Sequence, residues 1–161
     1  MTESSTARRC VVAGFDGSPA SRAAVSLAVE RARPDGRVVV VHAFEAPDTW
    51  SSGPDHQTLL DSALAHAQEL LAHIAEQVPD LAALDWDTEV LAGRPASALA
   101  SVANAERASE IVIGTRGVGR ARALRGSVAH DLIHRARCPV TVIPERALDE
   151  SGEDRLVATA G

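Results

Sequence analysis

The segment Arg37–Phe44 (RVVVVHAF) constrains the fold of this chain more than any other. Its four consecutive valines are β-branched, favour extended backbone, and form a run too short for a typical helix. They do not alternate with polar residues, as they would in a strand with one solvated face. A strand that is apolar on both faces must be covered on both, as in the middle of a parallel sheet. The segment therefore predicts a central parallel strand.

Four further strands are expected, at residues 10–15, 84–91, 111–113 and 140–143. Between them, apolar residues at spacings of three or four predict helices from Pro19 to Pro34, over 57–78, after Pro95 and from Ser127. Strands that alternate with helices specify a doubly wound parallel sheet with helices on both faces. Partial polar alternation in residues 84–91 is typical of an edge strand.

Composition limits the function classes. Apolar residues make up 45% of the 161 residues and aromatic residues only 2%, so Val, Ile, Leu and Ala must build the core. The net charge of −6 argues against general binding to nucleic acid or to acidic membranes. The scarcity of aromatic rings also removes the stacking platforms that single-stranded nucleic acid needs. We expect one domain at residues 8–145, with polar tails at 1–7 and 146–161.

The sequence also indicates a compartment. Its first residues lack the apolar region of a signal peptide, and no apolar run approaches the roughly 18 residues of a membrane span. Cys10 and Cys138 lie far apart, each beside an apolar run, and form no CxxC or zinc-type spacing. We interpret them as buried, reduced thiols. These features predict a cytoplasmic protein with no membrane partner.

The predicted sheet directs attention to the carboxyl ends of its strands. Ligands of doubly wound sheets bind beyond these ends, where the strand order reverses. Asp16 follows the first strand, His42 and Ala43 end the second, and Gly114 follows the fourth. If the first and fourth strands are neighbours, Asp16 and Gly114 line the same crevice. Asp16 then either binds a ribose hydroxyl or hydrated cation, or only forms a turn with Gly17.

A glycine- and arginine-rich segment follows the fourth strand. Its glycines allow the main chain to approach a ligand closely, and a helix N-terminus follows them at Ser127. No carboxylate lies between Glu110 and Asp131, so the local charge is positive. We interpret the segment as phosphate-binding; the alternative is a solvated loop. The residues concerned are Gly114, Arg116, Gly117, Gly119, Arg120, Arg122, Arg125 and Gly126.

Four segments of the chain match the motifs of a known family. The glycines fit neither GxxxxGK[ST] nor a dinucleotide fingerprint after the first strand. Instead, Gly-x-x-Gly, a short spacer, Gly-Ser-Val and a later Cys-Pro-Val resemble the loop of the universal stress protein family. The segment VVAGFDGSPASRAAV is similar to its opening strand and turn, VVVVHAFE to its second strand, and GRP to its Gly-x-Pro. The resemblance covers residues 9–144.

The resemblance implies the strand order 3-2-1-4-5 and a homodimer joined through the last strand. That strand consists of Val140, Thr141, Val142 and Ile143. Some family members bind ATP and others do not. The resemblance carries the nucleotide-binding positions over to Asp16, Ala43, Gly114, Gly117, Gly126 and Ser127. We add Arg116 of the basic segment, and we expect a Mg²⁺ ion to be compatible with the phosphates.

One departure from the family pattern leaves three hypotheses open. The spacer at residues 118–125 has eight residues, whereas the nucleotide-binding pattern has nine. The leading hypothesis is a dimeric stress-response regulator that binds ATP. The second is a nucleotide-free dimer that acts through protein contacts. The third is an adenine-nucleotide hydrolase or nucleotidyl transferase, and for it no nucleophile with an activating base is evident. We name no catalytic residue and expect at most slow ATP hydrolysis.

The histidines are weaker candidates. His130 and His134 have the i, i+4 spacing of a metal site but no recognisable third ligand, so a solvated helix face is favoured. His66 and His73 receive the same interpretation. His42 lies near the predicted crevice, where capping or packing is favoured over ligand contact. We therefore predict no protein-bound metal site.

Overall fold

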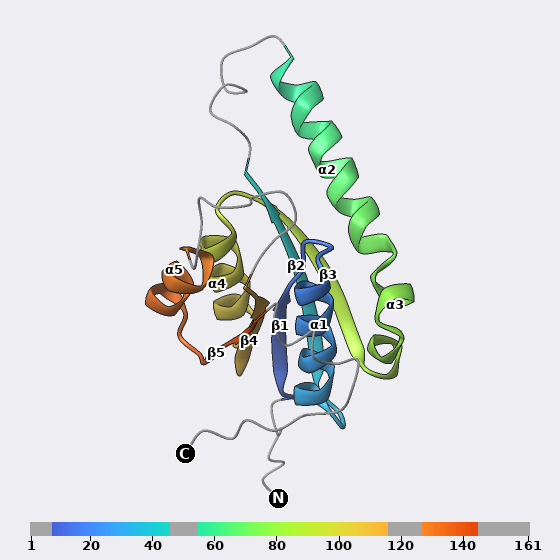
Figure 1. Cartoon of the computed structure of the whole chain (residues 1–161), viewed down its shortest axis with the longest axis vertical. Helices are drawn as coiled ribbons and strands as arrows, with labels where there is room; N and C mark the ends of the chain where they lie inside the picture. Colours follow the sequence, from blue (N-terminus) through green and yellow to red (C-terminus); the bar gives the residue numbers. More distant parts are fainter. Residues whose placement is uncertain (1–7, 46–54, 116–126, 145–161) are drawn as a thin grey trace, which may run out of the picture.

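The computed structural model describes residues 8–45, 55–115 and 127–144. In this part of the chain, strands and helices alternate (Figure 1). The strands are β1 (Cys10–Gly14), β2 (Arg37–Phe44), β3 (Asp85–Ala92), β4 (Glu110–Gly114) and β5 (Val140–Ile143). The helices are α1 (Pro19–Ala32), α2 (His56–Ala72), α3 (Ile74–Gln77), the 3₁₀ helix η2 (Pro79–Ala83), α4 (Pro95–Ala105) and α5 (Ser127–Arg135).

The five strands form one parallel sheet in the order β3-β2-β1-β4-β5. The predicted fold class and strand order are both confirmed. The chain adds strands outward from β1 to β3 and then crosses back, so the order reverses between β1 and β4. This reversal is the point at which doubly wound sheets bind their ligands.

Helices cover both faces of the sheet, and alternate residues of each central strand serve the two faces (Figure 1). Val11, Val38 and Val40 pack with α1 and with the end of α2. Val12, Val39 and Val41 pack with α4 and with Leu132 of α5. All four valines of β2 are at most 2% exposed, which explains why that strand carries no polar alternation. The position of β3 at the sheet edge is also as predicted.

The second predicted helix, over residues 57–78, is wrong as a single element. The structure has α2 to Ala72, a break at His73, the short α3, and then η2. Val78 leaves the helical conformation before Pro79, with φ −131° and ψ 78°, because a following proline disfavours helical backbone. Leu64, which shares the apolar spacing of this segment, is 38% exposed, and only Ala67 and Leu71 of α2 are buried.

The predicted tails at 1–7 and 146–161 lie outside the described residues, so the domain limits remain predictions. No helix in the described ranges combines the length and apolar character that a membrane span needs. Cys10 is buried and Cys138 half-buried, and both are free thiols.

Candidate functional site

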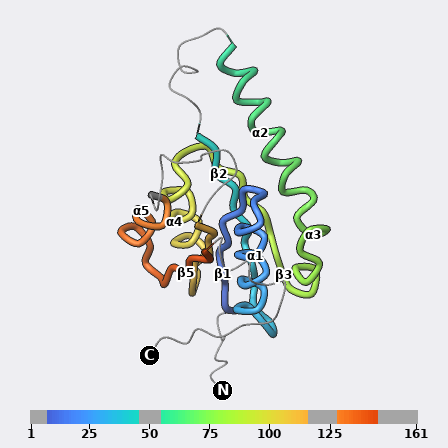
Figure 2. Tube along the Cα trace, viewed as in Figure 1, coloured from blue at the N-terminus to red at the C-terminus, as the bar shows by residue number. Residues whose placement is uncertain are grey.

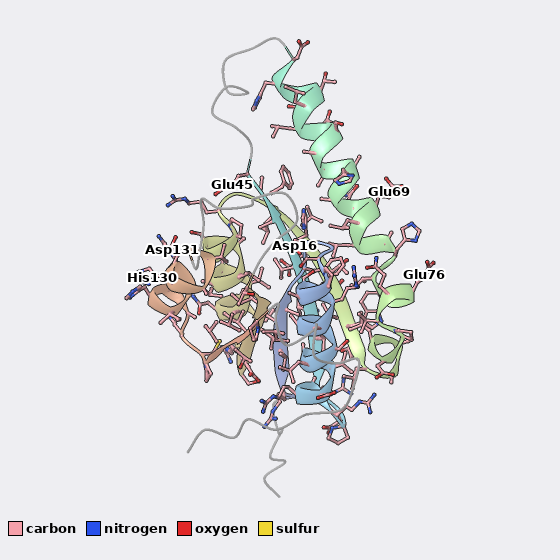
Figure 3. All side chains as sticks on the ribbon, viewed as in Figure 1. Asp16, Glu45, Glu69, Glu76, His130 and Asp131 are labelled. Atoms are coloured by element: carbon pink, nitrogen blue, oxygen red, sulfur yellow. The ribbon has the colours of Figure 1, made fainter. Side chains whose placement is uncertain are left out.

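The carboxyl ends of β1, β2 and β4 lie at one edge of the sheet. Gly14 of β1 is in register with Val41 of β2, and β4 runs beside β1 on the other side. This arrangement brings Asp16, Ala43 and Gly114 to the same edge, and Figure 3 shows Asp16 close to the start of α1. The predicted site residues Arg116, Gly117 and Gly126 lie outside the described residues. Ser127 begins α5, as predicted, and its side chain also lies outside the description.

Asp16 forms the turn between β1 and α1. Its Oδ1 accepts a hydrogen bond from the Ser18 N–H at 3.0 Å, and Gly17 adopts φ +84° between them. The turn interpretation of Asp16 is therefore confirmed. Among the described residues, no hydrogen bond to its other carboxylate oxygen, Oδ2, is recorded, so the turn uses only one of the two oxygens. The geometry of the turn leaves a ligand role for Oδ2 open.

At the N-terminus of α1, serine side chains of the helix and its cap accept hydrogen bonds from the main-chain N–H groups. Ser18 Oγ accepts from the Ser21 N–H at 3.1 Å, and Ser21 Oγ accepts from the Asp16 N–H at 3.3 Å. Pro19 has no N–H, and Ala20 is only 1% exposed. The first turn of α1 therefore offers no accessible N–H group to an anion. A phosphate at this edge of the sheet must be held elsewhere.

Gly114 has a packing role that the sequence did not reveal. A Cβ at this position would lie 2.7 Å from Ala20 Cβ, 2.8 Å from the Ala20 carbonyl carbon and 3.0 Å from the Ser21 nitrogen. Real Cβ atoms do not approach other atoms so closely. The end of β4 can therefore rest on the first turn of α1 only because residue 114 has no side chain. This requirement holds whether or not a ligand binds.

His42 connects the ends of two strands. Its Nδ1 lies 2.8 Å from the carbonyl oxygen of Phe15, and because that oxygen can only accept, Nδ1 carries the proton. The packing role expected for His42 is confirmed. The ring joins the end of β2 to the segment that leads from β1 to Asp16. Ala43, the next residue along β2, is half-buried.

Two residues near Asp16 were missed at the level of sequence. Ser21 makes the hydrogen bonds described above and donates to the Ser18 carbonyl oxygen at 2.9 Å. Arg22 Nη1 donates to the Gly17 carbonyl oxygen at 2.7 Å. The Ser-x-x-Ser spacing that starts at an N-cap could have pointed to Ser21. No comparable pattern identifies Arg22, because its contact depends on the path of the loop.

The cysteines lie away from this edge. Burial, and secondarily the Glu106 carboxylate, raise the pKa of the Cys10 thiol, while Arg37 acts in the opposite direction. Burial and then Glu110 raise the pKa of Cys138. A raised pKa reduces the thiolate fraction at neutral pH, so the expected inert thiols agree with the structure. No group of three or more His, Cys, Asp or Glu side chains in the described ranges is placed to hold a metal ion.

A separate groove of about 460 Å³ lies between α2 and β3. Leu64, Gln68 and Leu71 line one side, and Trp86, Thr88 and Val90 of β3 line the other. It lies beside β3, the outermost strand on one side of the sheet. The strands β2 and β1 separate it from the reversal between β1 and β4. The groove is therefore distinct from the predicted nucleotide site.

Comparison with known proteins identifies relatives over most of the chain. It is 31% identical over 137 residues to a universal stress protein of Thermus aquaticus, which covers 84% of this chain and 98% of the relative. It is 33% identical over 135 residues to a universal stress protein of Mycobacterium tuberculosis, which covers 82% of this chain and 44% of that longer relative. The chain thus corresponds to less than half of the mycobacterial protein.

Solved structures share the fold. One is a universal stress protein of Archaeoglobus fulgidus in complex with dAMP, with a TM-score of 0.59 and 25% identity, covering 84% of this chain and 96% of that one. Another is a universal stress protein in complex with cAMP, with a TM-score of 0.61 and 22% identity, covering 86% and 98%. The family model of the universal stress proteins matches residues 7–144. On this evidence the chain belongs to the universal stress protein family.

Proposed function

We propose that this protein is a cytoplasmic, homodimeric stress regulator that binds an adenine nucleotide, ATP with Mg²⁺, at the carboxyl edge of β1, β2 and β4. The observation that carries the proposal is the Asp16 turn at the reversal point of the sheet, which uses only one carboxylate oxygen. Family membership and the dAMP and cAMP complexes of structural relatives support the adenine nucleotide as the ligand class.

In this proposal each part of the ligand has its own partners. The adenine lies against Ala43 and the end of β4, and Asp16 Oδ2 accepts from a ribose hydroxyl or binds a hydrated Mg²⁺. Because the first turn of α1 is closed, the phosphates depend on the N-terminus of α5. The remaining site residues are Gly114, Arg116, Gly117, Gly126 and Ser127. Because the described residues place no base beside the phosphates, we expect at most slow hydrolysis.

Replacement of Asp16 by asparagine tests the ligand role without removing the turn. The amide oxygen of the new side chain can still accept from Ser18 N–H, whereas an NH₂ group replaces Oδ2. Loss of a charge-assisted hydrogen bond, worth about 1.5–3 kcal/mol, predicts that affinity for ATP falls roughly ten- to hundredfold. Calorimetric titration with ATP and Mg²⁺ measures this change. Asp35→Asn, at an exposed carboxylate, is the matched control and leaves the affinity unaltered.

The same titration separates the other hypotheses. If millimolar ATP with Mg²⁺ gives neither heat nor a thermal shift, the proposal fails and the nucleotide-free dimer takes its place. Rapid turnover of ATP that Asp16→Ala abolishes would instead indicate a hydrolase or transferase. Equal affinity of the Asp16→Asn variant and the wild type would remove Asp16 from the site.

We also propose that the dimer forms through β5. Ile111 N–H donates to the Pro139 carbonyl and Thr115 N–H to the Ile143 carbonyl. Since main-chain groups alternate in direction along a parallel ladder, those of Val140 and Val142 face away from β4. An apolar strand whose outer main-chain groups meet no partner strand among the described residues is an edge that favours pairing with a second copy. Two copies of β5 related by a two-fold axis would satisfy each other.

Proline substitutions at the two edges of the sheet test the dimer. Val142→Pro removes an outward-facing N–H from β5, and we expect the protein to become a monomer. Val90→Pro is the matched control on β3, because Val90 is half-buried and apolar like Val142. Because the Gly93 N–H donates to the Phe44 carbonyl, alternation places the main-chain groups of Val90 on the outer edge as well. Light scattering after size-exclusion chromatography measures the mass. A dimer that survives Val142→Pro but not Val90→Pro would place the interface at β3.

A further inference from the structure

A pair of histidines lies on the exposed face of α5. His130 and His134 are one helical turn apart, and both are exposed. Figure 3 shows His130 on the outer side of α5. Their ring centroids are 4.8 Å apart, with an angle of 73° between the ring planes. No ion pair or hydrogen bond of either ring is recorded within the described residues. The two rings are therefore close to each other and accessible from solvent.

The separation of the rings is close to what a shared metal ion requires. With metal–nitrogen bonds of about 2.0–2.1 Å, two ligating imidazole rings lie about 4.5 Å apart, centre to centre, at the right angle of a tetragonal Ni²⁺ or Cu²⁺ site and about 5 Å apart at the tetrahedral angle of Zn²⁺. The observed 4.8 Å lies between these values, so the helix backbone need not move. The remaining change is rotation of the rings until one nitrogen of each faces the ion. Exposed side chains make this rotation freely.

The packing of α5 against the core holds the backbone of the two histidines in place. Leu132, on the opposite side of α5, is fully buried against the core that α4 covers, so the helix is anchored between the two histidines. The carboxyl end of α5, where His134 lies, carries the negative end of the helix dipole. Arg135 is exposed, and solvent screens its repulsion of a bound cation.

We propose that His130 and His134 form a two-histidine binding site for a late first-row divalent metal ion, with water completing the coordination. Imidazole ligands select Ni²⁺, Cu²⁺ and Zn²⁺, and the usual order of stability makes Cu²⁺ the tightest. The site lies on the outer face of α5 and is independent of the nucleotide. It differs from a structural zinc site, because only two protein ligands contribute.

Calorimetric titration of the untagged full-length chain with NiCl₂ tests this site. We expect one Ni²⁺ per chain at the pair. Either His130→Ala or His134→Ala converts a two-point attachment into a single contact and lowers the affinity about a hundredfold. His66→Ala is the matched control, because His66 is exposed on α2 and its nearest histidine along that helix, His73, lies two turns away. This control retains the wild-type affinity.

Moving the second histidine to a neighbouring position distinguishes chelation by two histidines from a general effect of losing one. In the His134→Ala background, Ile133→His restores the same helix face at i, i+3 and should recover the affinity. Ile133 is 62% exposed, so the change does not disturb the core. Arg135→His in the same background places the ring at i+5, on another face, and should not recover it. Absence of Ni²⁺ binding by the wild type, or equal binding by His134→Ala and the wild type, would overturn the proposal.

Discussion

At the scale of single residues, Gly114 shows that close packing can require a glycine at a position where the sequence suggests contact with a ligand. A glycine at the end of the fourth strand suggests a backbone that a phosphate approaches. In the structure, the space that its side chain would occupy is filled by Ala20 and Ser21 of α1. Two of the three close atoms belong to the main chain, so rotation of a side chain cannot relieve the contact.

Gly114→Ala should therefore destabilise the protein even without nucleotide. Overpacking of this kind costs about 1–3 kcal/mol, which exceeds the 0.4–1 kcal/mol that alanine contributes by restricting the unfolded chain. Urea denaturation would measure the loss as a lower midpoint with an unchanged slope. Ala20→Gly in the same background should recover only part of it, because the Ala20 carbonyl carbon and the Ser21 nitrogen remain in place.

Gly14→Ala is the matched control for this argument. Its added Cβ would meet Ile113 Cγ2 at 3.1 Å and the Leu99 side chain at 3.4 Å, and these side chains can yield slightly. We expect a change much smaller than that of Gly114→Ala. Equal losses in the two variants would show that main-chain contact at residue 114 is not the cause.

The residues of the candidate site differ in how far the sequence could reveal them. Asp16 and Ser18 were predictable, because a turn and an N-cap depend on neighbours in the chain. The role of His42 was predictable only as packing near the crevice. Its actual partner, the Phe15 carbonyl, is 27 residues away and depends on the strand register. Arg22 was not predictable, because its acceptor is a loop carbonyl.

At the scale of secondary-structure elements, α2 shows the limit of periodicity. Apolar residues at a spacing of three or four continue from Leu60 to Val78, which predicts one helix with one buried face. In the structure, the N-terminal part of α2 extends away from the other elements (Figure 2). Only Ala67 and Leu71 of α2 reach the core, and the chain then bends at His73 to bury Ile74. The periodicity predicts which face of the helix is apolar, but it does not predict how much of that face can pack against the core.

Two leucines of α2 should therefore respond differently to truncation. Leu71 is 3% exposed and packs in the core, so Leu71→Ala should cost about 2–5 kcal/mol of unfolding free energy. Leu59 is 38% exposed near the start of the helix, so Leu59→Ala should change stability by no more than about 0.5 kcal/mol. Urea denaturation measures both. A loss of more than about 1 kcal/mol in Leu59→Ala would mean that this end of α2 is buried in solution, for example by a partner.

At the scale of the whole molecule, the fold was more predictable than the site. Strands that are apolar on both faces and alternate with helices leave few arrangements other than a doubly wound sheet. The strand order came from the family resemblance and is confirmed. The phosphate loop at residues 116–126 lies outside the described residues, so its role stays a prediction.

The whole-molecule composition also has a consequence for stability at alkaline pH. All 16 basic side chains are arginine, and the chain contains no lysine and no tyrosine. Arginine stays charged up to about pH 12, and the amino terminus titrates near pH 7.7–8. Between about pH 8.5 and 11 the side chains that titrate are therefore the thiols of Cys10 and Cys138. The pH dependence of stability in this range therefore reports the contribution of these two thiols.

The sign of that contribution follows from the direction of the pKa shifts. Burial raises the pKa of both thiols above the ordinary value of 9.0. In the unfolded chain the thiols lose their protons from about pH 9, whereas the folded protein retains them to higher pH. The folded state then binds more protons, so the free energy of unfolding falls as pH rises. The contribution is fully present below about pH 9 and declines by at most about 1.4 kcal/mol per pH unit for each thiol.

Urea denaturation in reducing buffer from about pH 7 to 10.5 should show this decline in the wild type. Cys10→Ala should remove part of the slope, and the variant with Cys10→Ala and Cys138→Ala should have a nearly constant stability across the range. Val12→Ala, beside Cys10 in the same core, is the matched control, because it lowers stability at every pH but retains both thiols. If the double variant keeps the wild-type slope, groups other than the thiols control alkaline unfolding. If the decline of stability with pH disappears in the double variant, it is caused by proton loss from the two thiols, which stabilise the folded state in their uncharged form.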